Sequence, residues 1–156
     1  MPRKGSVPKR QIGTDVKFKM LSVQRLINRL LTRGKKSIAQ RIVYDALDLV
    51  KEKTKQEPVD VFKKAIKNTT PLVKVKARRI GGSTYQVPVE VGQFEGESIG
   101  SRWLIHAARK RNGKSMIENL ASEFIDASNG QGAAVKKKDE THRMAEANKA
   151  FAHYRF

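Results

Sequence analysis

Residues 71–91 read PLVKVKARRIGGSTYQVPVEV, a pattern that predicts a β-hairpin. From Val73 onward, small apolar and basic side chains alternate, which is the period of a strand that is buried on one side only. Gly81 and Gly82 supply the turn, because glycine accepts the positive φ angles of a short hairpin loop. The returning strand places Tyr85 and three valines in one row. Pro88 has no N–H to donate, so this strand does not belong in the middle of a wide sheet.

The outer face of this hairpin is basic. It carries Lys74, Lys76, Arg78 and Arg79, and Glu90 is the only acid that balances them. An ordinary solvated face is the simple alternative, but a solubilising surface usually mixes both signs of charge. We therefore interpret the hairpin as an arm that lies along an anionic partner.

The composition points to the same kind of partner. The 156 residues suit one domain, and the net charge is +18, from 33 Lys and Arg against 15 Asp and Glu. Such an excess predicts a polyanion, with nucleic acid first and an acidic membrane surface second. No apolar run is long enough to span a membrane. The chain has no cysteine, which excludes disulfides and thiolate zinc sites.

Apolar residues at helical spacing predict helices on both sides of the hairpin. The expected helices cover about residues 20–33, 35–55, 58–70, 96–111, 115–127 and 133–156, with residues 92–100 expected as a connector that enters a helix only in its second half. The predicted fold class is mainly α: a single domain of about six helices, with one extended two-stranded β-hairpin (72–91) between the third and fourth helices. A basic arm (1–19) precedes the helices, and a C-terminal helix and tail (133–156) follow.

The N-terminal arm has no helical or strand period. Its basic residues, Arg3, Lys4, Lys9, Arg10, Lys17 and Lys19, face one acid, Asp15. Basic arms of this kind are commonly disordered alone and are ordered by a polyanion, whereas a dispensable tail is the alternative. Lys35 and Lys36 open a helix although cations there oppose the helix dipole, which indicates that they serve a ligand.

No catalytic or metal-binding pattern is present. Gly34-Lys35 and Gly113-Lys114 lack the first glycine of a phosphate-binding loop, since Arg29 and Ala108 occupy those positions. The histidines and the paired acids have no metal-ligand spacing. We expect neither an enzyme nor a cofactor.

Four blocks of sequence resemble one known family. They are GKKSIAQRIVYDAL (34–47), ARRIGGSTYQVPVEV (77–91), RWLIHAARKR (102–111) and HRMAEANKAFAHYR (142–155). Together they are similar to the ribosomal small-subunit protein seven family of the bacterial and plastid type, over nearly the full length. Members of this family bind the 3′ major domain of small-subunit ribosomal RNA, nucleate assembly of the subunit head, and lie near exit-site transfer RNA, outgoing messenger RNA and neighbouring head and platform proteins.

The resemblance implies a set of RNA-binding residues in this chain. They are Arg3, Lys4, Lys9, Arg10, Lys17, Lys19, Arg25, Arg33, Lys35, Lys36, Lys76, Arg78, Arg79, Arg102, Arg109, Lys110, Arg111, Lys114, Lys136, Lys137, His142 and Arg143. It also implies that Arg79, Gly81, Gly82, Ser83, Tyr154 and Arg155 lie near transfer or messenger RNA.

Two departures from the family pattern stand out. Lys74 occupies a position where relatives often have an acid, and the acidic connector 92–97 replaces an arginine-rich one. Gly92 directly after Val-Glu-Val resembles plastid members and favours a plastid ribosome over a bacterial one. A nonspecific nucleic-acid compactor, an RNA-processing enzyme and a membrane-surface protein are the alternatives to a structural RNA-binding component of the ribosome.

Overall fold

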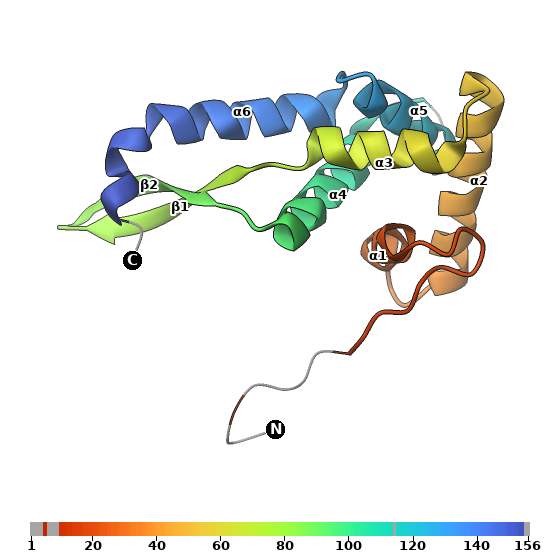
Figure 1. Cartoon of the computed structure of the whole chain (residues 1–156), viewed down its shortest axis with the longest axis horizontal. Helices are drawn as coiled ribbons and strands as arrows, with labels where there is room; N and C mark the ends of the chain where they lie inside the picture. Colours follow the sequence, from red (N-terminus) through yellow and green to blue (C-terminus); the bar gives the residue numbers. More distant parts are fainter. Residues whose placement is uncertain (1–4, 6–9, 114, 155–156) are drawn as a thin grey trace.

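The structure is a computed structural model that describes Gly5, residues 10–113 and residues 115–154. Its elements in chain order are α1 (Leu21–Leu30), α2 (Lys36–Thr54), α3 (Pro58–Thr69), β1 (Val73–Ile80), β2 (Ser83–Glu90), α4 (Gln93–Lys110), α5 (Met116–Ser128), α6 (Ala133–Ala147) and the 3₁₀ helix η1 (Lys149–Tyr154). Figure 1 shows the hairpin extending away from α1 and α2, with α6 running along it. The prediction of a mainly helical fold with a hairpin between the third and fourth helices is confirmed.

The core forms where the apolar stripes of the helices meet around α5. Phe62 of α3 and Phe124 of α5 are almost fully buried, and their rings meet edge to face with centroids 5.4 Å apart. Leu26 and Ile27 of α1 and Leu104 of α4 are also completely or almost completely excluded from solvent. The helical periods in the sequence therefore identified the inward faces correctly, because burial of these stripes drives the packing.

Helix α4 begins earlier than the sequence predicts. It starts at Gln93, so the expected connector is already the first two turns of the helix. Gly96 and Gly100 permit this, because the helix here passes directly over the end of α3. A Cβ atom on Gly96 would lie 2.8 Å from Thr70 Cγ2, and one on Gly100 would lie 3.0 Å from the Thr69 carbonyl oxygen. The glycines that read as loop residues are close-packing residues within a helix.

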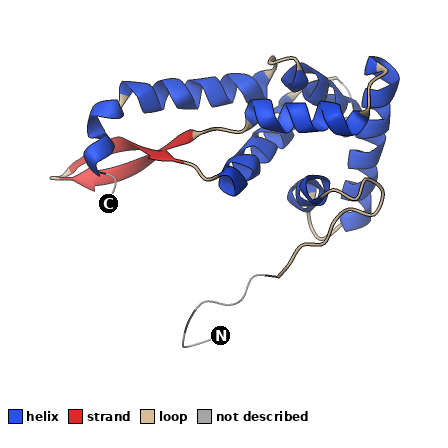
Figure 2. Cartoon of the chain, in the orientation of Figure 1, coloured by secondary structure: helices blue, strands red, loops and turns tan. Residues whose placement is uncertain are grey.

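Helix α5 begins with a side-chain cap, and helix α6 is followed by a short 3₁₀ helix. Ser115 caps α5 through a capping box with Glu118. Within the segment predicted as a C-terminal helix and tail, helix α6 ends at Ala147, and the 3₁₀ helix η1 follows after Asn148. In η1, Phe151 contacts the Tyr85 ring of β2, with centroids 4.9 Å apart. The change to a 3₁₀ helix therefore folds the C-terminal segment back onto the hairpin (Figure 2).

The hairpin has the predicted turn but not the predicted division into faces. Gly81 and Gly82 both have positive φ, +56° and +90°, and the strands pair antiparallel in a two-stranded sheet. The two-residue loop places Lys76 opposite Val87 and Ala77 opposite Gln86. Residues opposite each other share a face, so the valine row of β2 lies on the same face as the lysines of β1. Val87 is fully buried, whereas Ala77 is exposed, so the prediction that the valine and alanine row of β1 forms the buried side is wrong.

Candidate nucleic-acid interface

A cluster of basic side chains lies where α1 meets α4. Arg29, Arg102, His106 and Arg109 line one hollow of about 380 Å³ together with Ile105. Burial, followed by the positive charges of Arg102 and Arg25, lowers the pKa of the Arg29 guanidinium below its ordinary value. Lysine or arginine side chains gathered with so little opposing charge create a positive potential that attracts anions.

The α1–α2 connection extends this cluster. Arg33, Lys35 and Lys36 are exposed, and Lys35 lines a second hollow of about 220 Å³. Arg109 lines this hollow as well as the first, so it joins the two groups. We call Arg29, Arg33, Lys35, Arg102, His106 and Arg109 the α1/α4 patch. On α4 the exposed Lys110 directly follows it.

Arg25 of α1 contacts the acidic segment 92–97, which the family resemblance singles out in the sequence analysis. Its Nη1 lies 3.3 Å from Glu97 Oε2, and its guanidinium lies 4.4 Å from the centre of the Phe94 ring. Both partners belong to the first turns of α4. Arg25 therefore ties α1 to α4 and has fewer donors to offer to an outside ligand.

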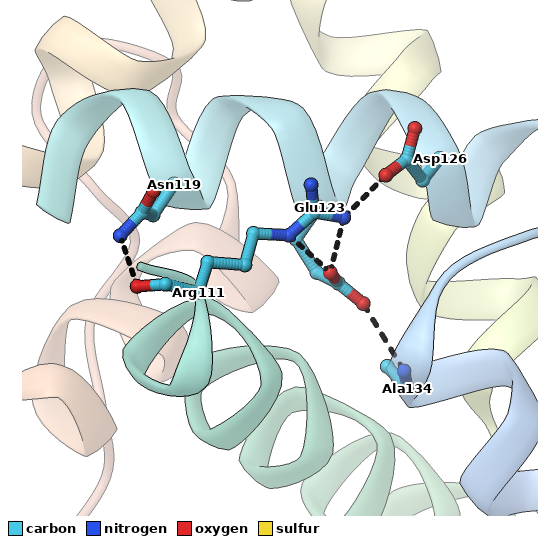
Figure 3. A network of polar contacts seen from close by, with 5 residues as sticks. All are labelled: Arg111, Asn119, Glu123, Asp126 and Ala134. Carbon is cyan, nitrogen blue, oxygen red and sulfur yellow. Dashed lines mark hydrogen bonds and ion pairs between the residues drawn. The ribbon is translucent and has the colours of Figure 1, made fainter. Parts of the chain in front are cut away.

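Arg111 is half-buried and is held in a network of ion pairs and hydrogen bonds at the end of α4 (Figure 3). Its Nε and Nη2 donate to Glu123 Oε2 at 2.9 and 2.7 Å, and Nη2 also contacts Asp126. Glu123 is fully buried, and its other oxygen accepts the Ala134 N–H at 3.1 Å. Burial alone would lower the pKa of Arg111, but the hydrogen bonds to Asp126 and Glu123 raise it above its ordinary value. This network joins the end of α4, α5 and the start of α6.

Residues 10–19 form a loop attached to α2. The carboxylate of Asp15, only 1% exposed, accepts the N–H groups of Lys17 and Phe18 at 3.1 and 3.0 Å and the Tyr44 hydroxyl at 2.6 Å. Lys17 Nζ lies 2.6 Å from Asp48. Arg10 and Lys19 are exposed. The chain's own contacts thus hold this part of the arm against α2.

The hairpin presents a second basic region. Lys76, Arg78 and Arg79 are exposed, as are Gly81, Gly82 and Ser83 at its tip. Lys74 is half-buried and forms an ion pair with Glu95 of α4. Tyr154 of η1 is exposed and packs beside His153. The hairpin tip is remote from α1 and α2 in Figure 1, so the basic residues form separate regions rather than one.

Helix α6 carries the remaining candidates. Lys136, Lys137 and Arg143 are exposed, and Lys137 lies 3.1 Å from Glu140. His142 accepts the Leu72 N–H through Nε2 at 3.1 Å, so this ring contacts the base of the hairpin. The candidates Arg3, Lys4, Lys9, Lys114 and Arg155 lie outside the described residues.

Sequence reasoning missed Arg29. It stands one helical turn after Arg25 on the polar side of α1, and that spacing was the available signal. Its importance comes from the approach of Arg102, which lies more than seventy residues away in the chain.

Two kinds of feature are missing from the described part of the chain. No three His, Cys, Asp or Glu side chains there are grouped so that they could hold a metal ion. No helix among the same residues is both long and apolar enough to cross a membrane.

Comparisons with known proteins find one family over nearly the whole chain. The family described as Ribosomal protein S7p/S5e matches residues 2–149. Over the full 156 residues and the full length of each relative, the chain is 55% identical to small ribosomal subunit protein uS7 of Moorella thermoacetica and of Dictyoglomus turgidum. It is 56% identical, over the same full lengths, to uS7 of the cyanobacterium Microcystis aeruginosa.

Proposed function

The chain belongs to the ribosomal protein S7p/S5e family, and from this premise we propose that it is a structural RNA-binding protein of the small ribosomal subunit. More specifically, we propose that it binds the 3′ major domain of the small-subunit ribosomal RNA and nucleates assembly of the subunit head. The family is structural and not enzymatic.

The α1/α4 patch is the observation that supports RNA binding most directly. Arg29, Arg102 and Arg109 converge on one hollow, and acids of the same helices turn elsewhere, as Glu97 does toward Arg25. Bringing cations together costs free energy in the isolated protein, and a bound polyanion recovers it by neutralising them.

The patch fits recognition of folded RNA through its backbone. An RNA helix hides its base edges in a deep, narrow groove, so proteins contact phosphates, 2′-hydroxyls and irregular loops. Guanidinium groups suit this task because each presents several donors in one plane to a phosphate. We propose that ribosomal RNA contacts the RNA-binding residues that the family resemblance implies, except Arg111. Arg29 is added to them.

The hairpin and η1 are the part that we propose for transfer and messenger RNA. Arg78, Arg79 and the glycine tip project from the helices, and η1 holds the hairpin at Tyr85. A rigid, basic projection reaches a ligand beyond the main RNA surface. Exit-site transfer RNA and outgoing messenger RNA are the ligands proposed here.

An RNA-binding experiment tests the proposal. We expect the chain to bind a 3′-domain ribosomal RNA fragment much more tightly than a random RNA duplex of equal length at equal salt. Equal affinity for both would instead favour a nonspecific nucleic-acid compactor. Replacing Arg102 and Arg109 with glutamine is expected to weaken binding to the fragment and to reduce its salt dependence by roughly two phosphate contacts.

The proposed location is the ribosome, in bacterial cytoplasm or plastid stroma. The relatives named above are bacterial, and the plastid assignment rests on the glycine after Val-Glu-Val. Sedimentation with small subunits through a high-salt wash tests the location, and release into the soluble fraction would contradict it.

A further inference from the structure

Asp15 is an unusual residue in its surroundings. It is the only acid among the first 44 residues, which contain twelve lysines and arginines. Nevertheless, its carboxylate is turned away from solvent, and the ammonium group of Lys17 pairs with Asp48 instead. Burying a carboxylate is costly unless it is hydrogen-bonded. The three groups that donate hydrogen bonds to the Asp15 carboxylate therefore show that the fold accommodates this side chain specifically.

The contact closes a loop and fastens it to α2. The Asp15 N–H donates to the Met20 carbonyl at 3.3 Å, which closes residues 15–20. The Phe18 ring meets Tyr44 edge to face at 5.8 Å, and Gln40 donates to the Tyr44 hydroxyl at 2.8 Å. We call Asp15, Phe18 and Tyr44 the clasp. Burial, followed by the hydrogen bond to Asp15, raises the pKa of Tyr44, which keeps its hydroxyl a donor.

The clasp leaves an outward surface that the protein's own core does not use. Val16 is 83% exposed and Ile12 is 44% exposed, although both are apolar. Arg10 and Lys19 are exposed beside them. In Figure 1 this segment turns around at α2 and returns to α1, the helix that carries the α1/α4 patch. The inner side chains hold the loop, and the outer ones are available to a ligand.

We propose that the clasp is a positioning device for RNA binding, in which Tyr44 and Asp15 fix the described part of the basic arm, residues 10–19 with Arg10 and Lys19, at the start of α1. The inference rests on the proposed function. A segment that the clasp holds in place loses less conformational entropy when it binds, so the clasp increases affinity without touching RNA. Tyr44 and Asp15 are therefore positioning residues.

A double-mutant cycle on the full chain tests the proposal. One change is Tyr44→Phe, which removes the hydroxyl and keeps the ring. The other neutralises the described part of the arm by replacing Arg10 and Lys19 with glutamine. The probe is the 3′-domain ribosomal RNA fragment, and the temperature is well below the unfolding transition of every variant.

Tyr44→Phe is expected to weaken binding about fivefold in the intact arm, as loss of one charge-assisted hydrogen bond would, and to leave binding unchanged in the neutralised arm. It should also lower the salt dependence toward that of the neutralised variant, because fewer phosphates are contacted. Hydrogen exchange at the Lys17 and Phe18 amides, which donate to Asp15, reports whether the clasp has loosened.

Thr54→Val is the matched control, because it removes a hydroxyl hydrogen bond at the C-terminal end of α2, away from the clasp, to the Val50 carbonyl at 2.7 Å. It should change stability but not RNA affinity. Equal weakening by Tyr44→Phe in both arm backgrounds, or no weakening in either, would overturn the proposal. A chain that prefers no RNA contradicts the proposed function instead, and the same cycle on a random duplex still decides whether the clasp positions the arm.

Discussion

Lys74 of β1 and Glu95 of α4 form an ion pair across the base of the hairpin. Both lie in stretches that the family resemblance singles out in the sequence analysis. The lysine that makes the hairpin more basic is thus paired with the acidic segment at the start of α4. The pair joins the first strand to the first turn of α4, while the Val91 N–H donates to the Leu72 carbonyl at 2.9 Å beside it.

The Lys74–Glu95 pair should make the hairpin base sensitive to acid. The hydrogen bond from Lys74 lowers the pKa of Glu95 below its ordinary value of 4.5. A carboxylate with a lowered folded-state pKa contributes stability above its unfolded pKa and loses it as pH falls through the folded value. Glu95→Gln is therefore expected to speed hydrogen exchange at Val91 at neutral pH, with the difference from the original chain vanishing in acid. In a Lys74→Met background, Glu95→Gln should not change hydrogen exchange at Val91. A change that persists in that background would show that the effect does not come from the Lys74–Glu95 ion pair.

Arg111 should matter for stability more than for RNA binding. Arg111→Met leaves the Glu123 carboxylate buried without its cation, which is expected to cost about 3 kcal/mol in the free energy of unfolding. Adding Glu123→Leu should recover much of that loss, because the unpaired charge is gone. Urea unfolding measures both changes. RNA affinity of the folded Arg111→Met variant should stay close to the original.

The neighbouring residue provides the control for Arg111. Lys110→Met removes an exposed cation of α4 and should have the opposite profile, with weaker RNA binding and little change in stability. If Arg111→Met weakened RNA binding as strongly as Lys110→Met does, Arg111 would be an RNA contact after all.

Arg102 should lower the stability of the free protein and strengthen its binding to RNA. Its positive charge lies close enough to Arg29 to lower the pKa of that guanidinium. Arg102→Gln relieves this repulsion and is expected to stabilise the free protein by about 0.5 kcal/mol or less at low salt, since solvent screens the partly exposed pair. The same change should weaken binding to the ribosomal RNA fragment. Thermal unfolding in low and high salt, combined with RNA titration, measures both effects. Weaker RNA binding without any stabilisation would show that repulsion between Arg102 and Arg29 does not destabilise the free protein.

Gly100 should resist substitution although it lies in a helix. Alanine favours a helix interior over glycine by about 1 kcal/mol. However, a Cβ atom at this position would lie 3.0 Å from the Thr69 carbonyl oxygen, so α4 must move away from α3. We expect Gly100→Ala to destabilise the protein by about 1–3 kcal/mol in urea unfolding. Ser98→Ala, on the same helix, should change stability by less than about 0.5 kcal/mol; a stabilised Gly100→Ala variant would show that the helices are not in close contact.

The sequence by itself determined the features that depend on local chemistry. The apolar periods of 21–30 and 58–69 fixed two helices and their buried faces, and Gly81-Gly82 fixed the hairpin turn through positive φ angles. The net positive charge predicted a polyanionic partner, because net charge follows from composition alone and does not depend on the fold.

Only the tertiary structure decided which basic residues have acidic partners within the chain. Lys17, Arg25, Lys74 and Arg111 are paired with Asp48, Glu97, Glu95 and Glu123. Each of these partners is at least twelve residues away in the chain, so no local period reveals the pairing. Packing likewise explains why glycine stands at positions 96 and 100 of helix α4, because the end of α3 passes where a side chain would stand. Local patterns place residues on faces, but only the approach of distant segments determines what those faces meet.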